Sequence, residues 1–140
     1  MAVDGKYAFA FSGIEPDIDE YAFQFFQRHK SIFDSFLQVA SDFIDKNLED
    51  FLSDKSSQSI EPLSNQILTY TYGAAISEVL KNNNIQPTMV AGFSLGVYAS
   101  LASINIVSFG DGLKMVCEPT GYFWYECNRR FDGSRNYKGD

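Results

Sequence analysis

The fold is decided by the stretch Val90–Gly96, which reads VAGFSLG: an apolar strand that runs directly into Gly-x-Ser-x-Gly. A serine between two glycines, at the end of a strand and the start of a helix, is typical of a nucleophile elbow. In such a turn the backbone of the serine is strained, its hydroxyl points away from the fold, and the glycines leave room for neighbouring backbone. The residues Val97–Ala102 follow with the spacing of a helix. Ser94 is therefore the candidate nucleophile.

The rest of the chain predicts strands that alternate with helices. Residues 7–11 form a short apolar run that is typical of a buried strand, and Asp17 or Asp19 could cap the helix that follows. The apolar residues of 20–45 recur every three or four positions, with a break near His29, and residues 63–80 repeat the pattern. We expect residues 47–59 to be a surface connection and a last helix to open at 106–109. This order predicts an α/β fold with a small, mainly parallel sheet flanked by helices on both faces.

Composition limits the classes of function. The chain has 140 residues, of which 45% are hydrophobic, so it can fill the core of one domain. A net charge of -7 argues against binding nucleic acid, which needs a basic surface. No run is long enough to span a bilayer, and the N-terminus lacks a signal peptide's apolar core, so we expect a cytoplasmic protein without membrane contact. Cys117 and Cys127 are not spaced as a redox or zinc pair, and no metal site is expected.

Around the serine, the sequence resembles the malonyl-CoA:acyl-carrier-protein transacylase family, the acyltransferases of fatty-acid and polyketide synthesis. The best match is residues 85–116, where Gly92-Phe93-Ser94-Leu95-Gly96-Val97-Tyr98 stands for the family's Gly-His-Ser-Leu-Gly-Glu-Tyr. Ser108-Phe109-Gly110-Asp111-Gly112-Leu113 then stands for its Ser-Phe-x-Asp-Ala-Leu. The resemblance covers roughly residues 7–117 and implies an incomplete version of the family's large subdomain.

The resemblance implies ping-pong acyl transfer from an acyl-CoA to the phosphopantetheine thiol of an acyl-carrier protein, with no permanently bound cofactor. Ser94 would be the nucleophile, and the backbone N–H of Leu95 would hold the oxyanion. Gln66 matches a glutamine that lines the acyl pocket. Phe93 and Ile14 would complete the substrate site, at positions where the family has histidine and a glutamine whose backbone is an oxyanion donor.

The chain departs from the family at other functional positions. The expected arginine for a malonyl carboxylate is replaced by Cys117-Glu118-Pro119, which leaves malonyl selectivity unsupported. The family's catalytic histidine lies far downstream, and the sole histidine here, His29, is expected to be a solvated helical residue. Without a general base, a serine hydroxyl is a poor nucleophile near neutral pH. We therefore expect impaired activity.

The tail suggests why the chain departs from the pattern. From Trp124 the periodicity is lost and the net charge turns positive, so residues 1–123 are expected to be a partial acyltransferase domain and 124–140 an irregular tail. Read one base later, the permitted codons can spell a small-residue strand like the family's continuation. This reading favours a frameshift that shortened a longer acyltransferase, and apolar surface left bare would promote self-association.

Two other functions remain open. An esterase or thioesterase of the α/β-hydrolase kind needs the same elbow but also a downstream acid and histidine. A non-catalytic remnant would bind a partner or have no activity.

Overall fold

A computed structural model describes residues 5–14, 19–53 and 62–117 of the chain. The predicted boundary at residue 123, the 124–140 tail and Cys127 lie outside these residues. The elements in chain order are β1 (Tyr7–Phe11), α1 (Glu20–Arg28), α2 (Lys30–Ile44), α3 (Leu48–Ser53), α4 (Pro62–Asn82), β2 (Pro87–Gly92), α5 (Gly96–Ser103) and α6 (Phe109–Cys117).

The two strands pair in parallel, as the sequence predicts. Phe9 lies opposite Val90 and Phe11 opposite Gly92, with a register shift near Tyr7. Because parallel strands cannot be joined by a tight hairpin, the chain crosses from β1 to β2 through α1–α4. The parallel register brings the carboxyl ends of β1 and β2 to the same edge of the sheet.

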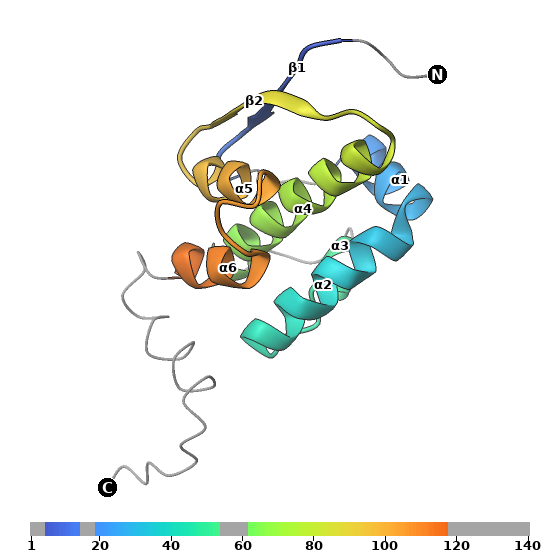
Figure 1. The fold of residues 1–140 in the computed structure, drawn as a ribbon. Coiled ribbons are helices and arrows are strands. Elements are labelled where there is room, and N and C mark those ends of the chain that lie inside the picture. Colours follow the sequence, from blue (N-terminus) through green and yellow to red (C-terminus); the bar gives the residue numbers. More distant parts are fainter. Residues whose placement is uncertain (1–4, 15–18, 54–61, 118–140) are drawn as a thin grey trace, which may run out of the picture.

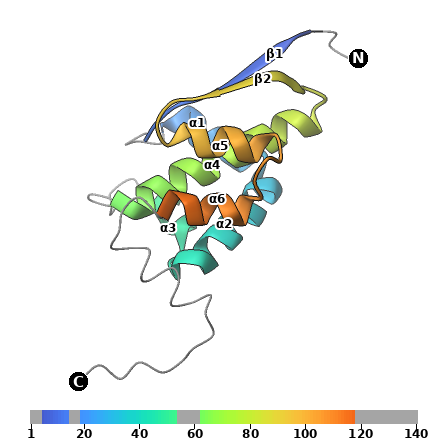
Figure 2. The ribbon, with the colours of Figure 1, turned by 60° about the vertical axis from the view of Figure 1, so that its left-hand side comes forward.

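The expectation of helices on both faces of the sheet is wrong for the described residues. In Figures 1 and 2 the helices all lie on one side of β1 and β2. Exposure agrees with this arrangement, since Phe9 is buried whereas Met89 on β2 is 66% exposed. A parallel strand covered on only one face is unusual, because such strands are generally buried on both.

The amphipathic region after β1 forms two helices, with the break at His29 that the sequence predicts. Asp19 caps α1 by accepting a hydrogen bond from the backbone N–H of Ala22 at 2.7 Å. The rings of Phe26 and Phe33 meet edge to face at 5.4 Å, and both are buried. The predicted apolar face of this region is thus its packing surface.

The surface connection expected at 47–59 is partly wrong. Residues 48–53 form α3, and the side chain of Leu48 is fully buried. The backbone N–H of Leu48 donates to Ser41 Oγ at 3.1 Å, which ties the start of α3 to α2. Residues 54–59 of the expected connection lie outside the described residues.

Helix α4 is the centre of the molecule. Its predicted buried positions are confirmed: Ile67, Tyr70, Ala74 and Val79 are each at most 4% exposed. A Cβ built on Gly73 would lie 3.3 Å from the ring of Phe11 and 3.4 Å from Ala99 Cβ. This glycine therefore allows α4 to lie close to β1 and α5, which carry the candidate site.

Helix α6 packs on α4 through its predicted apolar side, with Leu113 and Val116 buried. Tyr70 stacks on Phe109 at 5.1 Å, and its hydroxyl donates to the Phe109 carbonyl at 3.0 Å. Desolvation in this position raises the pKa of Tyr70. The last described helix is thereby fixed to the central one.

Candidate functional site

The residues Gly92–Gly96 form a sharp turn from β2 into α5, which we call the Ser94 turn. Ser94 has a φ of 53°, in the left-handed region that non-glycine residues rarely occupy. The turn is closed by the backbone N–H of Gly96, which donates to the Phe93 carbonyl at 2.9 Å. Ser94 is exposed to solvent. A strained backbone at an exposed serine is the geometry that presents a hydroxyl for chemistry.

Both glycines of the turn are required by close backbone contacts. A Cβ built on Gly92 would lie 2.5 Å from the carbonyl carbon of Gly96, and one on Gly96 would lie 2.3 Å from the carbonyl oxygen of Phe11. These distances are below any real Cβ contact, and the atoms met belong to the backbone. The end of β1, the turn and the start of α5 are therefore packed backbone against backbone.

The loop after β1 lies against the Ser94 turn. The N–H of Phe93 donates to the carbonyl of Phe11 at 3.0 Å, which extends the pairing of the strands into the turn. A Cβ on Gly13 would lie 3.6 Å from Ser94 Cβ. Ile14 follows Gly13 directly and is 48% exposed. The structure thus brings the loop that carries Ile14 close to Ser94.

Leu95 stands between the serine and the first residue of α5. It has helical backbone angles, and its side chain is 8% exposed. Among the described residues, no carbonyl or side-chain acceptor takes a hydrogen bond from the Leu95 backbone N–H. An open N–H at the start of a helix can hold a negative oxygen, because the helix dipole is positive there.

The two remaining predicted positions differ from each other. Phe93 is 77% exposed beside the serine, where a substrate could meet it. Gln66 lies half-buried on α4, and no hydrogen bond joins its side chain to any described residue. The geometry therefore does not test a substrate contact at Gln66.

No general base meets Ser94 in the part of the chain that the structure describes. His29 lies at the junction of α1 and α2, where its ring packs on Phe25 at 4.7 Å. Its backbone N–H donates to the carbonyls of Phe25 and Phe26. His29 therefore caps the end of α1 at the break between the two helices. Instead of the solvated helical residue that was expected, His29 is a half-buried helix cap.

A feature that the sequence interpretation missed is the absence of charge around the Ser94 turn. The segments 7–14, 62–77 and 82–110 contain no Asp, Glu, Lys, Arg or His. These segments supply β1 with the three residues that follow it, most of α4, and all of β2, the turn and α5. The signal was present in the sequence, but only the structure shows that the three uncharged segments pack together.

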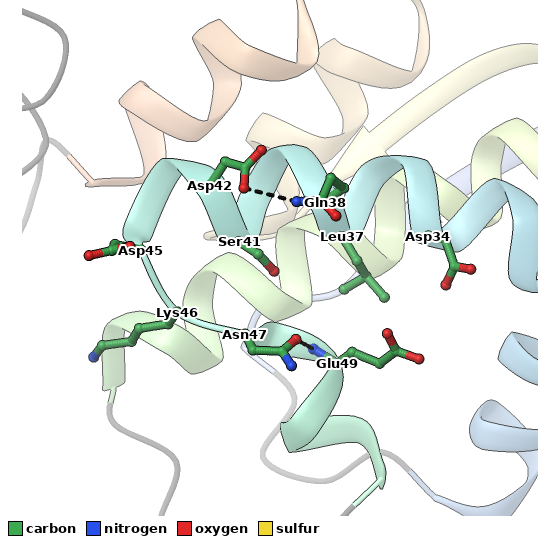
Figure 3. A pocket seen from close by; sticks show the side chains of 9 residues that line it. All are labelled: Asp34, Leu37, Gln38, Ser41, Asp42, Asp45, Lys46, Asn47 and Glu49. Carbon is green, nitrogen blue, oxygen red and sulfur yellow. Dashed lines mark hydrogen bonds between the residues drawn. The ribbon is translucent and has the colours of Figure 1, made fainter.

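The charges gather instead around a hollow of about 560 Å³ beside α2 and α3, seen in Figure 3. Nine residues line it: Asp34, Leu37, Gln38, Ser41, Asp42, Asp45, Lys46, Asn47 and Glu49. Polar side chains here bond to one another, as Gln38 Nε2 does by donating to Asp42 Oδ1 at 2.9 Å. Most of these acidic side chains are exposed, so they form a solvated face of the molecule.

Two further findings concern metals and membranes. Across residues 5–14, 19–53 and 62–117, no three His, Cys, Asp or Glu side chains are grouped so that they could hold a metal ion. The helices of the same ranges also lack the combination of length and apolar character that crossing a membrane requires.

Comparison with solved structures identifies the class of fold as that of acyltransferases. An acyl-carrier-protein S-malonyltransferase from Burkholderia pseudomallei superposes with a TM-score of 0.69 at 24% identity, over 80% of this chain and 36% of that one. A malonyl-transacylase solved in complex with a type II polyketide acyl-carrier protein gives 0.69 at 19% identity, over 80% of this chain and 37% of that one. At such identities the likeness shows the fold alone.

The sequence comparison finds relatives that share one enzyme name. The malonyl CoA-acyl carrier protein transacylase of Buchnera aphidicola is 28% identical over 115 residues, which are 79% of this chain and 36% of the relative. The enzyme of the same name from Staphylococcus aureus is 35% identical over 69 residues, 49% of this chain and 22% of the relative. No family model matches the chain. The chain is thus related in sequence and fold to the malonyl-CoA:acyl-carrier-protein transacylase family, and it spans about a third of the length of the first of these relatives.

Proposed function

We propose that the chain carries the nucleophile of an S-acyltransferase, which moves a malonyl or other acyl group from coenzyme A to an acyl-carrier protein. The observation that supports this most strongly is the left-handed backbone of an exposed Ser94 between β2 and α5. The relatives named above are transacylases of this kind, which supports the class of reaction.

In the proposed reaction, Ser94 Oγ attacks the thioester carbonyl and the C–S bond breaks. The hydroxyl proton leaves to solvent, and coenzyme A departs as its thiolate, which takes a proton from solvent to become the thiol. The carbonyl oxygen becomes an oxyanion, which the N–H of Leu95 and the backbone of Ile14 would stabilise. The phosphopantetheine thiol of the carrier protein then attacks the acyl-serine and regenerates the hydroxyl.

The rate of the proposed reaction depends on a base for the Ser94 proton. Among the described residues, no histidine or carboxylate is hydrogen-bonded to the Ser94 hydroxyl. Oxyanion donors and binding alone leave about 10³–10⁴-fold catalysis over water in a serine enzyme that lacks its triad. We therefore propose slow acylation for the chain alone.

The test uses isotopically labelled malonyl-CoA and acetyl-CoA, with peptide mass spectrometry to find the acyl group and a chase with holo-acyl-carrier protein. We expect label on Ser94 that moves to the carrier. Ser94→Ala should abolish it. The matched control is Ser100→Ala, because Ser100 lies on α5, is 5% exposed and donates its hydroxyl to the Val97 carbonyl. Label lost only to water would indicate a hydrolase, and absence of label on Ser94 would contradict the proposal.

A further inference from the structure

Three exposed apolar residues lie next to the Ser94 turn in the chain or in the loop that contacts it. Phe93 precedes it and is 77% exposed, and Val97, on the first turn of α5, is 41% exposed. Ile14 is 48% exposed and follows Gly13, whose Cβ would lie 3.5 Å from the ring of Phe93. We call Ile14, Phe93 and Val97 the apolar rim. Isolated apolar side chains are ordinary on a surface, but three around one strained serine form a contact surface for an apolar group.

No charge balances this rim within the described structure. The segments 7–14, 62–77 and 82–110, which build the surroundings of the serine, have no charged side chain. Lys6 precedes β1, at the end of the strand away from Ser94, since Tyr7 pairs with Pro87 and Phe11 with Gly92. Lys81 lies near the end of α4, where its ammonium is bound to Glu78 and to the Ser103 carbonyl.

Within the described segments around the serine, an acyl group with its own carboxylate would therefore find no cation to pair with. A carboxylate held against Phe93, Ile14 and Val97 would gain no ion pair and would give up part of its contact with water. The start of α5 offers partial positive charge, but in the proposed reaction the Leu95 N–H serves the thioester oxygen. An uncharged acyl chain meets no such penalty and gains contact with Phe93, Ile14 and Val97.

We infer that the Ser94 site accepts thioesters whose acyl group is uncharged and apolar, and that Phe93 is a specificity-determining residue for it. The inference rests on the proposed acyl transfer and narrows its substrate class. It separates this chain from the relatives named after malonyl-CoA.

The experiment compares acylation of Ser94 by the butyryl and malonyl thioesters of N-acetylcysteamine, followed by intact mass. We expect butyryl to react about tenfold faster, the ratio given by 1.4 kcal/mol of differential binding. Phe93→Arg should raise the malonyl rate relative to butyryl. Ile106→Arg is the matched control, because Ile106 is 65% exposed in the loop beyond α5. A measurable malonyl rate that equals or exceeds the butyryl rate, or the same shift in Ile106→Arg, would overturn the inference.

A binding measurement separates failure of the inference from failure of the proposed function. The Ser94→Ala protein is titrated with both thioesters and the dissociation constants are compared. Tighter binding of butyryl would uphold the preference even if neither thioester acylated the wild-type chain, in which case the proposed reaction alone fails. Equal binding, no binding or tighter malonyl binding would overturn the inference.

Discussion

The two ends of the molecule are built in opposite ways. Around the Ser94 turn, the described segments 7–14, 62–77 and 82–110 have no charged residue and pack closely along their backbones. In contrast, α2 and α3 lie beside an open hollow lined by acidic and polar side chains. The hollow offers volume and charge, and the turn offers strain, an open N–H and a hydroxyl. Concave sites are the usual first hypothesis for a binding or active site, whereas the function proposed here is placed on the turn and not on the hollow.

The largest effect is expected where the turn is packed most closely. In Gly96→Ala the new methyl would meet the carbonyl oxygens of Phe11 and Ser12, at 2.3 and 2.4 Å from an ideal Cβ. Because backbone must move, we expect a loss of about 3 kcal/mol or more in the free energy of unfolding, measured by urea denaturation. Gly110→Ala is the matched control, since nothing lies within 4 Å of its Cβ, and it should be neutral or slightly stabilising. Equal effects of the two changes would contradict the close packing.

Tyr72 joins the central helix α4 to α1 and α2, and its phenol makes stability depend on pH. Its hydroxyl donates to the Ala22 carbonyl, and desolvation raises its pKa from 10.0 to about 12. Between these values the unfolded chain ionises the phenol while the folded chain keeps it neutral, so stability is complete below pH 10 and falls as pH rises toward 12.

Tyr72→Phe should make the alkaline loss of stability less steep. Denaturation between pH 8 and 12 measures it, with Tyr21→Phe as control because Tyr21 is 81% exposed. Part of the alkaline loss of stability should remain in Tyr72→Phe, because the pKa of the buried Tyr70 is also raised. An unchanged slope in Tyr72→Phe would argue against this assignment.

A smaller effect, of opposite sign, is expected at the serine itself. Ser94 has a left-handed backbone at φ 53°, and Ser94→Gly relieves the strain of that conformation. Glycine also has more freedom in the unfolded chain, which offsets part of the gain. The net increase in the free energy of unfolding should be about 0.5–1 kcal/mol. Ser35 is exposed in the middle of α2, and Ser35→Gly should lower the free energy of unfolding by a similar amount. Thermal denaturation distinguishes the two signs, and destabilisation by both changes would mean that the turn stores no strain.

The smallest effect is expected at the charged end. Lys30 pairs with Asp34 at 2.7 Å and with Glu49 at 2.8 Å, and these carboxylates raise its pKa. All three side chains are exposed, so Lys30→Ala should cost little, and less again in 1 M salt. If Lys30→Ala lowered the free energy of unfolding as much as Gly96→Ala, the ion pairs of α2 and α3 would be major sources of stability, which would contradict the account.

Local signals in the sequence predicted much of this structure. The Asp19 cap, the break at His29, the buried face of α4 and the turn around Ser94 each depend on residues within a few positions of one another. Helix α3 was not predicted, because six residues are too few to show a helical period. Its burial depends on contact between Leu48 and α2, which the local sequence does not show.

The features of the site that depend on distant segments could not be predicted in this way. Gly13 approaches Ser94 only because β1 and β2 are neighbours in parallel register, and this register places Ile14 by the serine. Tertiary packing also explains two other features of the site. The helices cover one side of the sheet, and three uncharged segments meet at Ser94.

The most direct test of the account is the relative reactivity of Ser94 toward a neutral fluorophosphonate, which modifies serine hydroxyls faster the more nucleophilic and accessible they are. Peptide mapping of the labelled protein locates the adduct. The account predicts modification at Ser94 ahead of the other serines and its loss in Ser94→Ala. Labelling that is spread evenly over surface serines, with Ser94 no faster than exposed Ser35, would contradict it.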